Sequence, residues 1–226
     1  HEHTLSASGG SDKFQGYASF GYLDQKGTQP GQAYERYTLK TSFDVTPVDW
    51  FKMGSSINAS YSTQDYGYSF SKSVTGSGDF YSALRSMIPW TMPYDENGEY
   101  VRYPSGDVNI INPIRELDYN TNQRRTFRAS ASMYSLIDFG KIWKPLEGLS
   151  YRLQFGPEFE FYTLGVANAA DGIIGDGNNG AQYKNEQKRA WTLDNLIYYN
   201  KTLGQHSLGM TLMQSPYDYN YEMGDM

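Results

Sequence analysis

The sequence predicts an all-β fold, an antiparallel transmembrane β-barrel segment of about eight strands. Apolar and polar residues alternate along several segments, and such a period of two gives a strand one apolar and one polar face. Short and long connections also alternate along the chain, as they do between the two rims of an outer-membrane barrel. Aromatic residues lie near several expected strand ends, where barrels carry their interfacial girdles.

The clearest of these patterns is a predicted β-hairpin over residues 35–61. Before the sequence TPVD (46–49), apolar side chains occupy odd positions from Tyr37 to Val45; after it, they occupy odd positions from Phe51 onward. Neither segment has the three- and four-residue spacing of an amphipathic helix. A turn is expected at 46–49 because Pro presets a turn dihedral and Asp can bond its own backbone.

The same alternation predicts the remaining strands. They cover approximately residues 2–8, 14–23, 125–139, 149–163, 189–200 and 206–214. The short connections are GGSD (9–12), TPVD (46–49), GKIWKPLEG (140–148) and KTLGQ (201–205). The long ones, expected to be extracellular loops, cover about 24–33, 63–122 and 164–188. Residues 215–226 depart from a strand pattern, so no strand is predicted there.

Composition excludes several classes of protein. The 21 Tyr and 23 Gly suit sheets and turns. The absence of Cys excludes disulfides and thiolate metal sites, and the net charge of −6 argues against a general nucleic-acid binder. No apolar stretch is long enough for a membrane-spanning helix. The first residues show no export signal and open inside a predicted strand, so we expect a piece of a longer protein.

Two folds fit strands that have one apolar and one polar face. In a soluble sandwich a second sheet would cover the apolar face, whereas in a barrel lipid covers it and the polar face lines a lumen. A loop as long as 63–122 is unusual in a sandwich, which favours the barrel. On that interpretation the lumen-facing residues include Arg36, Lys40, Asn58, Arg152, Glu158 and Glu160.

The longest loop is expected to be ordered. Residues 78–90 predict a short helix, capped by Asp79 and stopped by Pro89, with Tyr81, Leu84 and Ile88 on one face. Residues 92–106 then predict a small hairpin that turns at Glu96-Asn97-Gly98.

The sequence gives little support for a catalytic site or a metal site. Glu158 and Glu160 share a strand face about 7 Å apart, a separation that glycosidase carboxylates can use, but a lumen wall lined with acids, beside Arg152, is the favoured explanation. His1 and His3 lack a third ligand in view. The stretch DGIIGDGNNG (171–180) has the composition of a calcium loop without the EF-hand spacing. We therefore expect no enzyme and no cofactor, with calcium as the one alternative.

Several segments of the sequence resemble segments of a known protein family. They are HTLSASGGSDK (3–13), YASFGYLDQKG (17–27), RYTLKTSFDVTPVDWFKMGSSINASYS (36–62), PYDENGEY (93–100), NPI (112–114) and LIYYNKTLGQHSL (196–208). In this order they resemble the SusC/RagA family of TonB-dependent outer-membrane transporters. Gly16 departs from the pattern, since an aromatic residue often precedes the Tyr there, and the chain ends in Met226 instead of the usual aromatic residue.

The resemblance implies a 22-strand barrel with an N-terminal plug domain. Such a barrel is an integral outer-membrane protein that imports oligosaccharides or peptides with a SusD-like surface lipoprotein, powered through TonB. Residues 1–226 would then be a partial barrel domain from the middle of the barrel, with the plug absent from this chain. The segment QRRTFR (123–128) would meet nearby acids or lipopolysaccharide rather than nucleic acid.

The residues proposed to contact substrate are aromatic side chains of the longest loop. They are Trp90, Tyr94, Tyr100 and Tyr103, whose rings could stack on sugar faces or pack against peptide side chains. Alternatively these rings pack the loop on itself or dock the lipoprotein. Two other functions stay open: a secreted β-sandwich that binds carbohydrate, and a jelly-roll hydrolase that uses Glu158 and Glu160.

Overall fold

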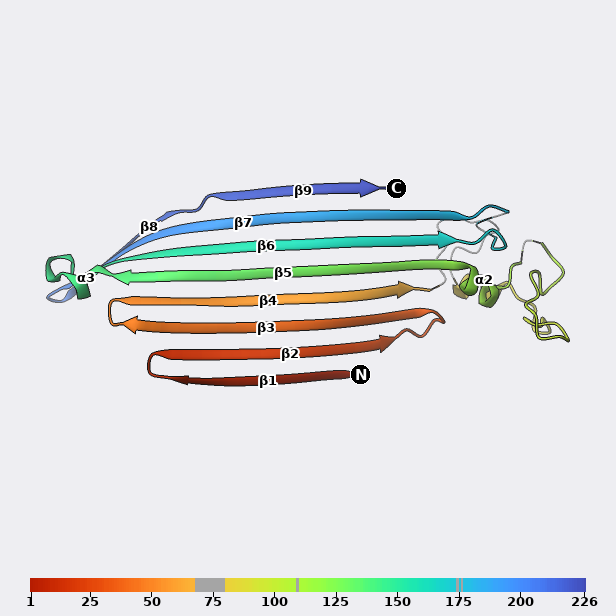
Figure 1. Cartoon of the computed structure of the whole chain (residues 1–226), viewed down its shortest axis with the longest axis horizontal. Coiled ribbons are helices and arrows are strands. Elements are labelled where there is room, and N and C mark those ends of the chain that lie inside the picture. The colour runs from red at the N-terminus through yellow and green to blue at the C-terminus, as the bar shows by residue number, and fades with distance from the viewer. Residues whose placement is uncertain (68–79, 109, 174, 176) are drawn as a thin grey trace.

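The computed structural model describes residues 1–67, 80–108, 110–173, 175 and 177–226. In these residues nine strands form one antiparallel sheet (Figure 1). The strands are β1 Glu2–Ser11, β2 Phe14–Lys26, β3 Gln32–Val48, β4 Phe51–Tyr66, β5 Asn120–Asp138, β6 Leu149–Asn168, β7 Gly180–Leu203, β8 His206–Gln214 and β9 Tyr217–Asp225. The helices are α1 Phe80–Arg85, α2 Pro113–Tyr119, α3 Phe139–Ile142 and the 3-10 turn Lys144–Leu146.

The strands follow one another in the order of the sequence from β1 to β8, and β9 also pairs with β7. β8 and β9 keep the same register on β7, with Met213 opposite Leu196 and Tyr217 opposite Thr192. They are one edge strand in two pieces, interrupted at Ser215 and Pro216. The sheet thus has about eight positions side by side, as the sequence predicts, but the prediction of no strand after residue 214 was wrong.

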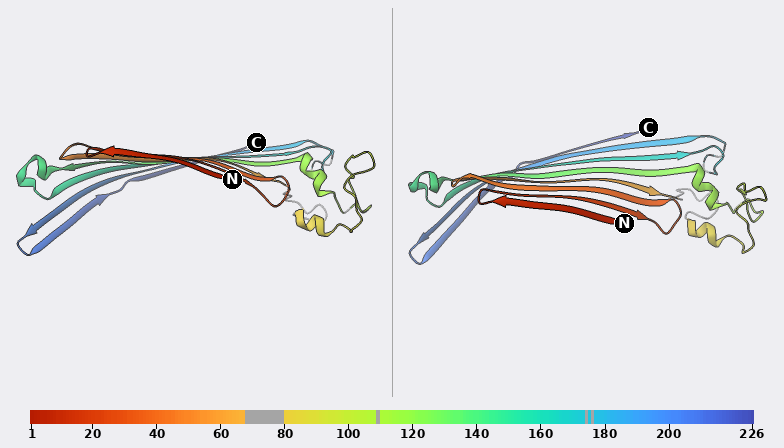
Figure 2. Two further views of the ribbon diagram at one scale, coloured as in Figure 1. Left: turned by 90° about the horizontal axis from the view of Figure 1, so that it is seen from below. Right: turned by 60° about the horizontal axis from the view of Figure 1, so that its bottom comes forward.

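The sheet is a single twisted layer. Figure 2 shows it edge-on, with neither face covered by a second sheet. Short connections lie at one end and long ones at the other (Figure 1), in the alternation that the sequence predicts. One turn is displaced: β3 continues to Val48 through a register shift after Val45, so the chain reverses at Asp49 and Trp50 instead of at 46–49.

Several strands are longer than predicted at the end that bears the long connections. β5 begins at Asn120 instead of 125, β6 continues to Asn168, and β7 begins at Gly180 instead of 189. The added residues of β7 read GAQYKNEQK and are mostly polar on both faces. A strand with two polar faces has no period-two pattern, which explains the missed length.

The buried apolar cluster lies beyond the sheet, between the two longer connections. It consists of Phe80, Ala83, Ile111 and Ile173, with Tyr103 and Leu117 packed against it. Helix α1 lies within the predicted helix of 78–90 but ends at Arg85, so Pro89 does not stop it. The predicted face was also wrong, because Tyr81 and Leu84 are exposed while Phe80 and Ala83 are buried. The predicted cap, Asp79, lies outside the described residues.

The small hairpin of the longest loop is present. Tyr94 and Tyr100 pair across it, and the turn closes with a hydrogen bond from the Gly98 N–H to the Asp95 carbonyl of 3.1 Å. Gly98 has a φ of +83°, which suits glycine. Among the described residues, no helix has the length and apolar character needed to cross a membrane.

Candidate functional site

One face of the sheet carries an exposed apolar belt. The register aligns Tyr22, Tyr37, Tyr61, Phe127 and Phe161 in one row across β2 to β6. Two neighbouring pairs in this row are in ring contact: the centroids of Tyr22 and Tyr37 are 5.0 Å apart, and those of Phe127 and Phe161 are 6.1 Å apart. On β4 and β6 the belt runs from this row to Phe51 and Tyr151, about ten residues further along each strand, which is the length that a membrane-spanning strand needs.

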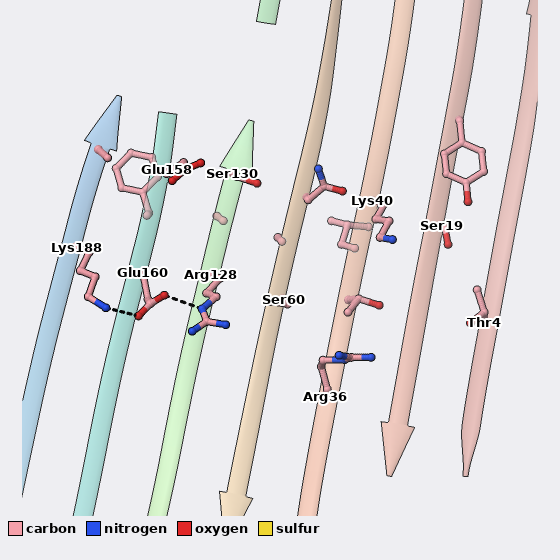
Figure 3. Close-up of a pocket in the computed structure, with 18 of the residues that line it drawn as sticks. Thr4, Ser19, Arg36, Lys40, Ser60, Arg128, Ser130, Glu158, Glu160 and Lys188 are labelled. Atoms are coloured by element: carbon pink, nitrogen blue, oxygen red, sulfur yellow. Dashed lines mark hydrogen bonds and ion pairs between the residues drawn. The ribbon is translucent and has the colours of Figure 1, made fainter. Parts of the chain in front are cut away.

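The opposite face carries the polar residues that the sequence assigns to a lumen. Arg36, Lys40, Asn58, Glu158 and Glu160 line one shallow concavity. Figure 3 shows the floor of this concavity, where Ser60, Ser130 and other small side chains lie between the charged ones. Arg152 lies outside this concavity and places its guanidinium 4.4 Å from the centroid of the Tyr134 ring.

Glu160 lies at the centre of an ion-paired group on three adjacent strands. Its Oε2 accepts from Arg128 Nε on β5 at 2.7 Å, and its Oε1 accepts from Lys188 Nζ on β7 at 3.0 Å (Figure 3). A carboxylate held by two cations stays ionised, so Glu160 is unsuited to act as a general acid beside Glu158. Arg36, Lys40 and Glu158 form no ion pair with any residue that the structure describes.

The four loop aromatics have different surroundings. Trp90 is 77% exposed, whereas Tyr103 packs against the buried cluster. Tyr94 and Tyr100 stack on each other with centroids 5.0 Å apart. Hydrogen bonds to Asp118 and then to Tyr94 raise the pKa of Tyr100 to about 12. The loop therefore uses one face of Tyr94 and of Tyr100 for its own packing, and Trp90 remains the most open of the four.

A buried polar cluster that sequence reasoning missed holds the two longer connections together. Asn112, Arg115 and Glu116 are 1%, 8% and 1% exposed. Arg115 donates to Glu116 Oε1 at 2.6 Å and to the carbonyl of Asp171 at 2.8 Å. The N–H of Ile173 donates to Glu116 Oε2 at 2.9 Å. Asn-Pro before a helix signals a helix cap, but no local pattern points to partners so far along the chain.

The stretch 171–180 contributes its backbone to this cluster. Within the described residues no group of three or more acidic or histidine side chains is placed to hold a metal ion. Asp176 lies outside those residues, so the calcium alternative stays a prediction.

A single antiparallel sheet with an apolar belt on one face and an ion-paired polar surface on the other defines the wall of an outer-membrane-type β-barrel. No protein-family model matches the chain. It is similar to the TonB-dependent receptor P39 of Formosa agariphila, with 24% identity over 227 residues that cover 96% of this chain and 20% of that receptor.

Solved structures with the same fold are transporter chains. A structure of the RagAB peptide transporter matches with a TM-score of 0.75 and 18% identity over 99% of this chain and 25% of that one. The RagAB peptide importer in its "open-open" and "closed-closed" states gives TM-scores of 0.67 and 0.63, at 20% and 19% identity and with the same coverage. The chain therefore spans about a quarter or less of these relatives.

These comparisons confirm the resemblance to TonB-dependent transporters of the SusC/RagA kind. They also confirm the fold class, since the antiparallel sheet matches part of a barrel and is not closed within this chain. The named relatives are a receptor and transporters rather than enzymes, in agreement with the expectation that the chain is not an enzyme.

Proposed function

We propose that this chain forms part of the barrel wall of a TonB-dependent outer-membrane transporter. The transporter imports oligosaccharides or peptides together with a SusD-like surface lipoprotein, and TonB drives it through parts of the protein outside this chain. The observation that carries the proposal is the two-faced sheet, whose exposed belt has the length of a membrane-spanning strand and whose opposite face is polar.

The rival fold, a secreted carbohydrate-binding sandwich, requires a second sheet over the belt. The described strands form one sheet, and Phe20, Leu39 and Phe159 are 48%, 46% and 41% exposed. Lipid is the covering that suits so much exposed apolar surface. Above the belt, Arg125 lies on the outer face by register with Thr63 and Thr163, where it can meet lipopolysaccharide.

The proposal is tested by deleting the gene for the full-length protein. We expect uptake of a defined set of labelled oligosaccharides or peptides to fall to the level of a strain without functional TonB. Uptake of small sugars that pass through porins serves as the control and stays unchanged. If the deletion strain takes up all these oligosaccharides and peptides at the normal rate, the proposal is wrong.

Trp90 is the loop residue that we propose for first contact with substrate, since most of its surface is open. Tyr94, Tyr100 and Tyr103 would shape the surface beside it.

A further inference from the structure

The pairing of β4 with β5 is not set by a short turn. The two strands are neighbours in the sheet, but the chain between them runs from residue 67 to residue 119. In a hairpin, turn type and loop length fix the register, and so long a connection cannot do so. The alternation of apolar and polar residues excludes a slip by one residue, which would exchange the two faces. It does not exclude a slip by two residues, because the faces then stay the same.

A contact that is specific to one register crosses β4 at Gly54. Asp44 of β3, Gly54 of β4 and Tyr134 of β5 lie in one row. They alternate in step with Lys40 and Asn58, so the row lies on the polar face of the sheet. The Tyr134 hydroxyl donates a hydrogen bond to Asp44 Oδ1, so the phenol spans the strand between the two residues.

The ring passes over Gly54 because this residue has no side chain. A Cβ at Gly54 would lie 2.7 Å from Tyr134 Cε1, 2.5 Å from Asp44 Oδ1 and 2.8 Å from the carbonyl oxygen of Phe43. A glycine inside a strand often marks a place where another group approaches the backbone closely. Here that group is the phenol of Tyr134.

Charged side chains hold both ends of this contact. Arg152 on β6 places its guanidinium 4.4 Å from the centroid of the Tyr134 ring, and Lys52 Nζ lies 3.8 Å from Asp44 Oδ1. The contact thus joins β3 to β6 beside the point where β3 shifts register, after Val45. All four strands lie inside the sheet, so the contact does not depend on the strands that continue the barrel.

A slip of β5 by two residues would break this contact in either direction. Tyr134 would then lie opposite Lys52 or Ser56 of β4 instead of Gly54. Either residue has a Cβ where the ring has to pass, so the phenol could no longer reach Asp44. The contact therefore distinguishes the native register from the two slips that the alternation allows.

We propose that Tyr134, Gly54 and Asp44 form a register clamp, which aligns β5 on the β3–β4 hairpin while the barrel assembles and keeps it aligned afterwards. The clamp does for β4 and β5 what the short turn at Asp49 and Trp50 does for β3 and β4. It acts whatever the transporter carries, so its test is separate from the uptake test.

The test measures the register by disulfide cross-linking in the full-length protein, isolated from the membrane in a background free of other cysteines. Ser56 and Ser132 lie directly opposite each other, and cysteines at such positions can be bridged. Cysteines at Ser56 and Ser130, or at Asn58 and Ser132, are diagonal neighbours about 7–8 Å apart, which can be bridged only if β5 slips by two residues. With the clamp intact, we expect the Ser56/Ser132 pair alone to form a disulfide.

Gly54→Ala and Tyr134→Ala should each lower the yield of the native disulfide by roughly half and allow one of the shifted pairs to form. Tyr134→Phe keeps the ring but loses the hydrogen bond, so it should give a smaller change in the same direction. Gly165→Ala is the matched control, since a Cβ on this strand glycine has no atom within 4 Å. It should leave the native disulfide at full yield.

Only protein with the heat-dependent gel migration of a folded barrel is scored. Where an Ala variant gives too little folded barrel, Tyr134→Phe decides the result. If the clamp variants form the native disulfide at full yield and no shifted one, the clamp is wrong. The clamp is also wrong if Gly165→Ala shifts the register as much as Gly54→Ala, because any added methyl group would then have the same effect.

Discussion

Asn112 connects three parts of the longest loop through one buried side chain. Its Nδ2 donates to the carbonyls of Pro93 and Val101, both at 2.9 Å, which ties the two arms of the small hairpin. Its Oδ1 accepts from the N–H groups of Ile114 and Arg115 and so caps α2. The cap can be predicted from the sequence Asn-Pro, but the hairpin contacts cannot, because they depend on tertiary structure.

Replacing Asn112 with Ala removes the cap and takes away the Nδ2 donor of the part-buried Val101 carbonyl, while the Pro93 carbonyl keeps its hydrogen bond from the Val101 N–H at 3.0 Å. We expect the loop to lose about 2–4 kcal/mol of local stability. Hydrogen exchange of the full-length protein should show the loss as faster exchange over residues 93–119. Val108→Ala, an exposed site in the same loop, should leave the exchange unchanged, and normal protection in Asn112→Ala would contradict the assigned role.

The phenol of Tyr100 should lose its proton at a higher pH than an ordinary tyrosine. Its raised pKa means that ionisation breaks a hydrogen bond in which the protonated phenol is the donor. The contact with Asp118 is therefore fully present below the ordinary tyrosine pKa and is lost as the pH rises through about 12. The absorbance difference at alkaline pH between the full-length protein and Tyr100→Phe measures this titration. Asp118→Asn should move it toward the ordinary value; an unchanged titration would contradict the assignment.

At the scale of elements, the sequence predicts a strand well wherever lipid imposes an apolar face. Phe43, Ile57 and Phe159 are apolar positions of the alternation that predicts their strands, and the register places them on one face. The missed segment 120–124 and most of 180–188 lie past the belt, where neither face has to be apolar. Residues 217–222 pair with residues 187–192 of β7, level with the belt, so their omission has another cause. β9 alternates cleanly, but Pro216 precedes it and its apolar residues change face without a change of register.

The two longer connections should behave as one unit, because Glu116 on one binds the backbone of Ile173 on the other and pairs with Arg115. In Glu116→Ala the Arg115 charge stays buried without its partner, a loss that costs about 3–5 kcal/mol. We expect limited proteolysis to cut both connections faster in this variant. Glu99→Ala, at an exposed turn position, is the control, and accelerated cleavage in only one connection would contradict the coupling.

The whole molecule is an open sheet with little interior of its own. Within the described residues, the buried apolar side chains belong to the loop cluster, not to the sheet. The stability of the sheet must therefore come from strand pairing and from what covers its faces in the complete barrel. This is why sequence patterns could indicate the two faces but not the ligand-contacting residues, which depend on the closed lumen and on long-range loop contacts.

A lysine introduced on the belt face of the sheet should have a different effect on stability from a lysine introduced on the polar face. Ile57 lies within the apolar belt, and its neighbour Asn58 lines the polar concavity. In the full-length protein folded in lipid vesicles, Ile57→Lys should lower the free energy of unfolding by about 2–4 kcal/mol, because an ammonium near the bilayer midplane loses its hydration. Asn58→Lys should change it by less than about 1 kcal/mol, since its side chain stays in water. Urea unfolding followed by gel migration measures both. Equal losses at the two positions would mean that lipid does not cover the belt, and the barrel-wall assignment would then fail.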